Sequence, residues 1–120
     1  MKHYQFLVFV LLLFSACANV GLSTIPVTGN WSGTLTDGTA IALTNVRGNV
    51  DISATLQVAN EASRALKGSY AENGLSLQAS DALGTVIFSA IVSEDAMTGS
   101  LVRTPADGTA TSSTFNLSRQ

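Results

Sequence analysis

Charge, cysteine and histidine are all scarce in this chain of 120 residues. Charged residues make up 12% of it, six basic against eight acidic, so it lacks the basic surplus that nucleic-acid binding requires. One cysteine and one histidine do not supply the four Cys and His ligands of a structural zinc site. Hydrophobic residues amount to 46%, which excludes a disordered chain, and the length allows one domain.

The longest apolar run lies near the N-terminus. Phe6 to Phe14 are nine consecutive apolar residues, too few to span a bilayer. Lys2 precedes this run and the small residues Ser15 and Ala16 follow it, which is the pattern of a secretory signal peptide over residues 1–16. Removal of this leader leaves no histidine and five basic residues against eight acids.

The end of the leader carries the single cysteine. Phe14-Ser15-Ala16-Cys17 resembles the lipobox of bacterial lipoproteins, although Phe14 stands where Leu is usual. The resemblance implies that Cys17 is lipidated and becomes the new N-terminus. Ordinary signal peptidase offers an alternative, because Ala16-Cys17-Ala18 also fits its A-x-A pattern. Cleavage after Ala18 would discard the cysteine and release a secreted or periplasmic protein.

We expect lipidation, since a lone cysteine at the end of an apolar leader otherwise has no role. Acyl chains on Cys17 would hold the protein on a membrane of the bacterial cell envelope. In a Gram-negative host, the absence of Asp at position 18 resembles the sorting pattern for the outer membrane. Residues 17–28 are then the lipidated cysteine and a flexible tether, and residues 29–120 are the folded domain.

From residue 29 onward, short apolar alternations are separated by Gly, Asp and Asn, a pattern typical of antiparallel strands. In one of them Val50, Ile52 and Ala54 alternate with polar residues, which predicts one core face and one solvent face. Short connections favour an all-β, up-and-down antiparallel meander that forms a small barrel or a strongly curved sheet. We predict eight strands, over residues 29–35, 40–44, 50–58, 65–70, 75–79, 85–92, 96–103 and 109–118.

Three strands share the form apolar, x, Gly, Ser/Thr, apolar, centred on Gly33, Gly68 and Gly99. Each glycine falls on the inward face, where a missing side chain lets a strand bend or a neighbour pass over it. The repeat therefore predicts curvature. Positive-φ residues for tight turns are expected at Asp37-Gly38, Asn73-Gly74, Gly84 and Asp107-Gly108.

The register of two strands can be predicted from their turn. Pairing residues 85–92 with 96–103 across Ser93 to Ala96 sets Phe88 opposite Leu101, Ala90 opposite Gly99 and Val92 opposite Met97. The same register sets Ile87 opposite Val102 on the outer face, with Ile91 nearby. The other outward positions are mostly Ser, Thr, Gln and Asn, which excludes a lipid-facing barrel.

Gly29-Asn30-Trp31, at the start of the first expected strand, resembles the G-x-W motif that opens the calycin barrels, meaning lipocalins and avidins. In lipocalins an arginine near the end of the last strand stacks over that tryptophan. Arg119 has the inward parity of its strand and is the matching residue. A typical lipocalin is longer than this chain, and avidins line their biotin site with several tryptophans, whereas this chain has one. The resemblance therefore implies barrel architecture and not biotin binding.

The chemistry left after the leader points to binding rather than catalysis. With no imidazole and no free thiol, the common triads are excluded, and we expect no enzyme activity, metal or cofactor. The acids fall mostly in expected turns, where Asp serves backbone geometry. We therefore expect an envelope-anchored structural or binding module.

Two regions could provide binding. One is the barrel interior, where Trp31, Tyr70 and Phe88 would contact a small apolar ligand, the alternative being a filled core. The other is the outer group Ile87, Ile91 and Val102, a surface for docking on another envelope protein.

Overall fold

The computed structural model of the protein describes residues 25–120, so the leader, the lipobox and Cys17 lie outside the described residues. No helix that could cross a membrane is found in this part of the chain. It forms eight strands: β1 (Gly29–Leu35), β2 (Ala40–Gly48), β3 (Asp51–Val58), β4 (Arg64–Ala71), β5 (Gly74–Asp81), β6 (Gly84–Ser93), β7 (Ala96–Pro105) and β8 (Thr111–Arg119).

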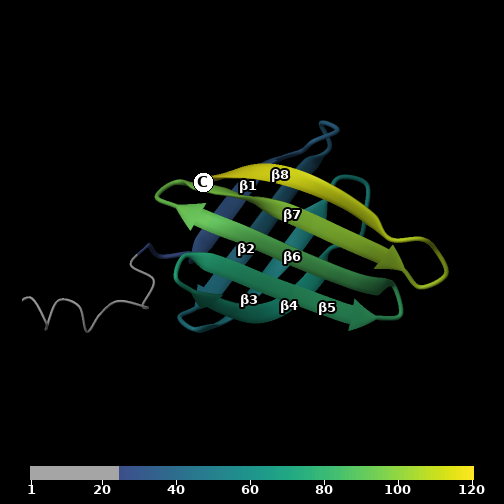
Figure 1. Cartoon of the computed structure of the whole chain (residues 1–120), viewed down its shortest axis with the longest axis horizontal. Helices are drawn as coiled ribbons and strands as arrows, with labels where there is room; N and C mark the ends of the chain where they lie inside the picture. Colours follow the sequence, from purple (N-terminus) through teal and green to yellow (C-terminus); the bar gives the residue numbers. More distant parts are fainter. Residues whose placement is uncertain (1–24) are drawn as a thin grey trace, which may run out of the picture.

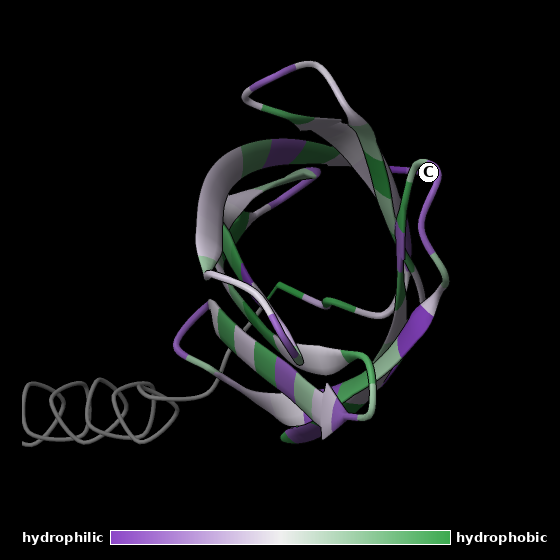
Figure 2. Ribbon diagram, turned by 90° about the vertical axis from the view of Figure 1, so that its right-hand side faces the viewer, coloured by the Kyte–Doolittle hydropathy of each residue, from purple (hydrophilic) through white to green (hydrophobic). Residues whose placement is uncertain are grey.

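The strands form a closed antiparallel barrel in which each strand pairs with its sequence neighbours and β8 pairs with β1 (Figure 1). Viewed along its axis, the sheet makes a complete ring (Figure 2). The predicted all-β up-and-down fold is confirmed, and the sheet closes instead of remaining an open curve. The predicted β6–β7 register is also confirmed, with Phe88 opposite Leu101 and Val92 opposite Met97.

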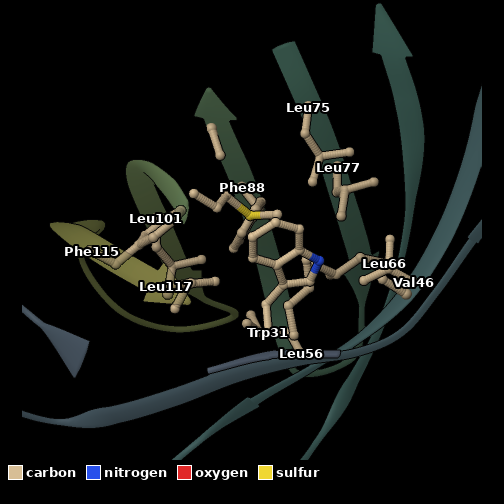
Figure 3. Close-up of a cluster of buried hydrophobic side chains, with 14 of the residues drawn as sticks. Trp31, Val46, Leu56, Leu66, Leu75, Leu77, Phe88, Leu101, Phe115 and Leu117 are labelled. Carbon is tan, nitrogen blue, oxygen red and sulfur yellow. The ribbon is translucent and has the colours of Figure 1, made fainter. Parts of the chain in front are cut away.

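All eight strands contribute inward apolar side chains to one core (Figure 3). Trp31, Phe88 and Leu101 have no exposed surface, and the rings of Phe88 and Phe115 stack with centroids 4.7 Å apart. Side chains thus fill the middle of the barrel, as expected for an eight-stranded barrel of this kind. Burial of this apolar area is the main stabilising contribution to the fold.

The three repeated glycines lie where the backbone of a neighbouring strand comes very close. A Cβ on Gly33 would lie 1.8 Å from the Asn116 carbonyl oxygen of β8, and one on Gly68 would lie 1.7 Å from that of Ser76 in β5. Gly99 meets Ser89 of β6 in the same way, at 1.9 Å. Only a residue without a side chain allows these backbone approaches, which bend the sheet into a ring.

Strand β2 extends four residues beyond its predicted end at residue 44. Asn45 adopts positive φ and the β2–β3 register shifts there, so a bulge interrupts the strand without ending it. The Asn45 N–H donates to Oδ1 of Asn30 in β1, 2.9 Å away. Val46 then returns to the core.

Two other local predictions are wrong. Val50 is 58% exposed and not inward, because it lies in the two-residue turn before β3. In the β4–β5 hairpin Asn73 adopts positive φ as expected, but the second such residue is Glu72 and not Gly74, and Gly108 does not adopt positive φ. The positive φ expected at Gly38 and Gly84 is present.

Candidate functional site: the two ends and the outer face of the barrel

Residues 25–28 pack against the end of the barrel where β1 begins, here called the closed end. Val27 is buried, and its carbonyl accepts a hydrogen bond from the Trp31 indole Nε1, at 2.9 Å. The Tyr70 hydroxyl donates to the Ile25 carbonyl, at 2.6 Å. The last four residues of the expected tether therefore belong structurally to the folded domain.

Arg119 holds the closed end together. Its guanidinium lies over the Trp31 ring, 4.2 Å from the centroid, which is the contact that the resemblance to lipocalins implied. Its Nη1 donates to the Thr28 carbonyl at 3.0 Å, and its Nη2 donates to the Pro26 carbonyl at 2.6 Å. Asp95 lies 3.5 Å from Nε and balances the charge. One side chain thus joins the last strand, the first strand and the N-terminal segment.

The structure brings Trp31, Tyr70 and Phe88 into the packed core. Trp31 and Phe88 have no exposed surface, and Tyr70 is 5% exposed. The polar atoms of Trp31 and Tyr70 are engaged by residues 25–27. All three are therefore core residues, and none of them lines the pocket at the opposite end of the barrel.

The opposite end, here called the mouth, carries a partly enclosed pocket of about 290 Å³. Leu56, Val58 and Val86 give it an apolar floor, and all three are buried. Its walls come from loop 59–63 and from the mouth ends of β4, β6 and β7. The remaining lining residues are Glu61, Ala62, Arg64, Leu83, Thr85, Arg103, Thr104 and Pro105.

Two arginines form the polar part of the mouth pocket. Arg64 is 12% exposed in its side chain, and its Nη2 donates to Oδ1 of Asp81 and to the Gly84 carbonyl, both at 2.9 Å. Its Nε is buried and has no hydrogen-bond partner among the described residues. Arg103 pairs with Glu61 and thereby joins loop 59–63 to β7. The two ion pairs leave the pocket neutral overall.

The sequence reasoning missed this pocket, although a signal for it existed. Arg64 shares the inward parity of Leu66, and Arg103 shares that of Leu101. An arginine at an inward position can be accommodated only at the end of a barrel, where its head reaches solvent or a ligand. The prediction began the fourth strand at residue 65, which removed Arg64 from the inward pattern.

The predicted docking residues Ile87, Ile91 and Val102 lie on the outer face of the barrel, as the predicted register requires. Ile87 is 42% exposed and Ile91 is 61% exposed, and Ile87 lies opposite Val102. Ile91 borders a shallow hollow whose lining includes Gly74 and Ser89. The structure therefore presents this group on one continuous surface of the sheet.

The acidic residues give little sign of a chemical site. Asp37 accepts a hydrogen bond from the Thr39 N–H in the β1–β2 turn. Hydrogen bonding by the Thr39 side chain, and then by its backbone N–H, lowers the pKa of the Asp37 carboxyl. No group of three metal-ligating side chains occurs within residues 25–120.

Comparisons of the chain with protein-family models, with curated proteins and with solved structures found no match.

Proposed function

We propose that the protein is a non-enzymatic binding module of the bacterial envelope, anchored through lipid on Cys17, that holds a small amphipathic ligand in the mouth pocket. The observation that carries this proposal is the position of the pocket. The pocket lies at the barrel end opposite residues 25–28, which connect the barrel to Cys17. An anchored barrel would therefore present the pocket away from the membrane.

The dimensions of the mouth pocket favour a small ligand. Its volume of about 290 Å³ is close to the smallest volumes of ligand pockets, about 300 Å³. A long acyl chain would have to enter the barrel interior, which is already filled by side chains such as Trp31, Phe88 and Leu101, all without exposed surface. The ligand is thus a compact molecule and not a long-chain lipid.

The chemistry of the pocket favours a ligand with an apolar body and an acceptor oxygen. The apolar body would lie on Leu56, Val58 and Val86, because contact with these apolar side chains removes its surface from water. The buried Nε of Arg64 lacks an acceptor, and such an unsatisfied group costs about 1–3 kcal/mol. A ligand oxygen placed beside Arg64 would remove this cost.

Native mass spectrometry of the chain purified from its own envelope tests the ligand proposal. We expect a reproducible small-molecule mass on the wild type and its loss in Ala62→Trp, which fills the pocket from an exposed loop. Ala106→Trp is the matched control, since residue 106 is also in a mouth loop but does not line the pocket. A bare mass for the wild type, or equal retention in both variants, would contradict the proposal.

The anchor is tested separately by labelling cells with a palmitate analogue. We expect label on the wild type and none on Cys17→Ser. Label that survives in Cys17→Ser, or no label on the wild type, would instead favour cleavage after Ala18 and a released protein.

A further inference from the structure

Loop 59–63 places a carboxylate at the wall of the mouth pocket. The Glu61 side chain pairs with Arg103 of β7, and both residues line the pocket. An inward-facing arginine is thus already paired with one carboxylate at this site. The same arginine, next to an apolar floor, can take the carboxylate of a ligand in place of the one that the chain itself supplies.

The two partners of this ion pair differ in exposure. The Glu61 side chain is 50% exposed, whereas that of Arg103 is 23% exposed. When a ligand enters, the carboxylate returns to water at the lower cost, because it has lost less of its hydration. Arg103 stays in the pocket wall and changes partner. An anionic ligand is therefore favoured over a cationic one, which would have to replace Arg103.

The backbone of Glu61 is held independently of its side chain. Its N–H donates to the Val58 carbonyl at 3.0 Å, and its carbonyl accepts from Nε2 of Gln57 at 2.6 Å. A rotation of the side chain to another rotamer releases the carboxylate and leaves the loop, with Ala62 in the pocket wall, in place. The cost is small, since an exposed ion pair contributes little to stability.

Arg64 adds a second cationic group whose donors are only partly used. All the hydrogen bonds that it donates within residues 25–120 come from Nη2, to Asp81 and to the Gly84 carbonyl. Asp81 is 53% exposed and does not line the pocket. Once Glu61 has turned away, the pocket lining holds two arginines and no acid. The lining then attracts one negative charge.

We propose that the ligand of the mouth pocket is a compact monocarboxylate, which replaces the Glu61 carboxylate on Arg103 and lays its apolar body on the buried floor. This ligand class rests on the proposed function and makes it specific. One negative charge is exchanged for one, which a doubly charged phosphate monoester would not achieve. Glu61 is then an internal competitor, displaced only by an anion that also gains contact with the floor.

Isothermal titration calorimetry tests the ligand class. It uses the full chain, purified from its own envelope and dialysed to remove small molecules. The probes are benzoate and cyclohexanecarboxylate, each compared with its amide, which has nearly the same shape and no charge. We expect the carboxylates to bind the wild type and the amides to bind about tenfold more weakly, because hydrogen bonds to charged groups are stronger.

Two substitutions at the ion pair test the exchange. We expect Glu61→Gln, which removes the competitor and keeps its size, to lower the carboxylate dissociation constants about threefold, as for an exposed ion pair. Arg103→Gln should raise them at least about tenfold. Asp107→Asn is the matched control for Glu61→Gln and should leave them unchanged. It removes one negative charge from the same end of the barrel, at a residue that does not line the pocket.

Circular dichroism confirms that each variant is folded, and the Glu61→Gln result stands even if Arg103→Gln does not fold. The proposal is overturned if no carboxylate binds, if the amides bind as tightly, or if Glu61→Gln leaves the affinities unchanged. If the chain then still carries a small-molecule mass that Ala62→Trp loses, only the ligand class is wrong and the binding function stands. Absence of that mass as well removes the binding function.

Discussion

Arg119 shows how much one side chain does in this barrel. It stacks on Trp31 and donates to the Pro26 and Thr28 carbonyls, so three separate segments depend on it. We expect Arg119→Ala to lower the free energy of unfolding by about 2 kcal/mol, from the lost cation–π contact and the charged hydrogen bonds. Urea unfolding followed by Trp31 fluorescence measures this.

Trp31 emission should also shift to longer wavelength in Arg119→Ala, because residues 25–28 no longer cover the indole. Arg47→Ala, which removes an exposed arginine on β2, is the control and should change neither quantity. Unchanged stability and emission in Arg119→Ala would mean that the contact contributes nothing to closing the barrel.

At the scale of elements, the glycines decide whether strands can meet. A Cβ on Gly68 would lie 1.7 Å from the Ser76 carbonyl oxygen, an approach that only backbone movement can relieve. We expect Gly68→Ala to destabilise the fold by at least about 3 kcal/mol. Thermal unfolding followed by circular dichroism measures the loss.

Gly108→Ala is the matched control for this prediction. Its new Cβ would meet only the Pro105 side chain, at 3.3 Å, and its backbone does not adopt positive φ. The expected change is below about 1 kcal/mol. Equal effects of the two substitutions would show that strand approach at Gly68 is not what matters.

The strands themselves were predictable because one face of each is buried and the other is solvated, which gives a strict period of two. The inward glycines and short connections predicted curvature, but they fit a strongly curved open sheet as well as the closed barrel that the structure has. What failed was local backbone conformation, as at Asn45. An asparagine with positive φ fits both a turn and a bulge. Only its hydrogen bond with Asn30, fifteen residues away, selects the bulge.

The candidate site was less predictable than the fold. The inward parity of Trp31, Tyr70 and Phe88 correctly put them in the interior, but parity does not tell packed space from empty space. The mouth pocket depends on loops 59–63 and 82–83, whose paths are set by contacts such as Arg103 with Glu61. Such contacts join residues far apart in sequence and leave no periodic pattern.

The whole molecule has two unlike ends, and this makes a prediction about orientation. If Cys17 is lipidated, the seven residues 18–24 span at most about 25 Å between the lipid and the barrel. The closed end then lies near the membrane and the mouth lies a barrel length further out. A fluorophore on Asp95→Cys should be quenched by spin-labelled lipid more strongly than one on Asp107→Cys.

Asp95 and Asp107 suit this comparison because both are exposed turn residues, at the closed end and the mouth respectively. Equal quenching at the two positions would mean that the barrel lies on its side or is not held by its N-terminal segment.

Because the first strand pairs with the last, the barrel can close only when the whole chain is available. Until Thr111–Arg119 has emerged, β1 and β7 each present an unpaired edge, and Trp31 lacks the arginine that covers it. A chain that crosses a membrane from its N-terminus onward therefore cannot complete its fold midway. If this chain is secreted in that way, it would complete the barrel only after its last strand arrives, and a chain interrupted before β8 would expose two edges open to aggregation.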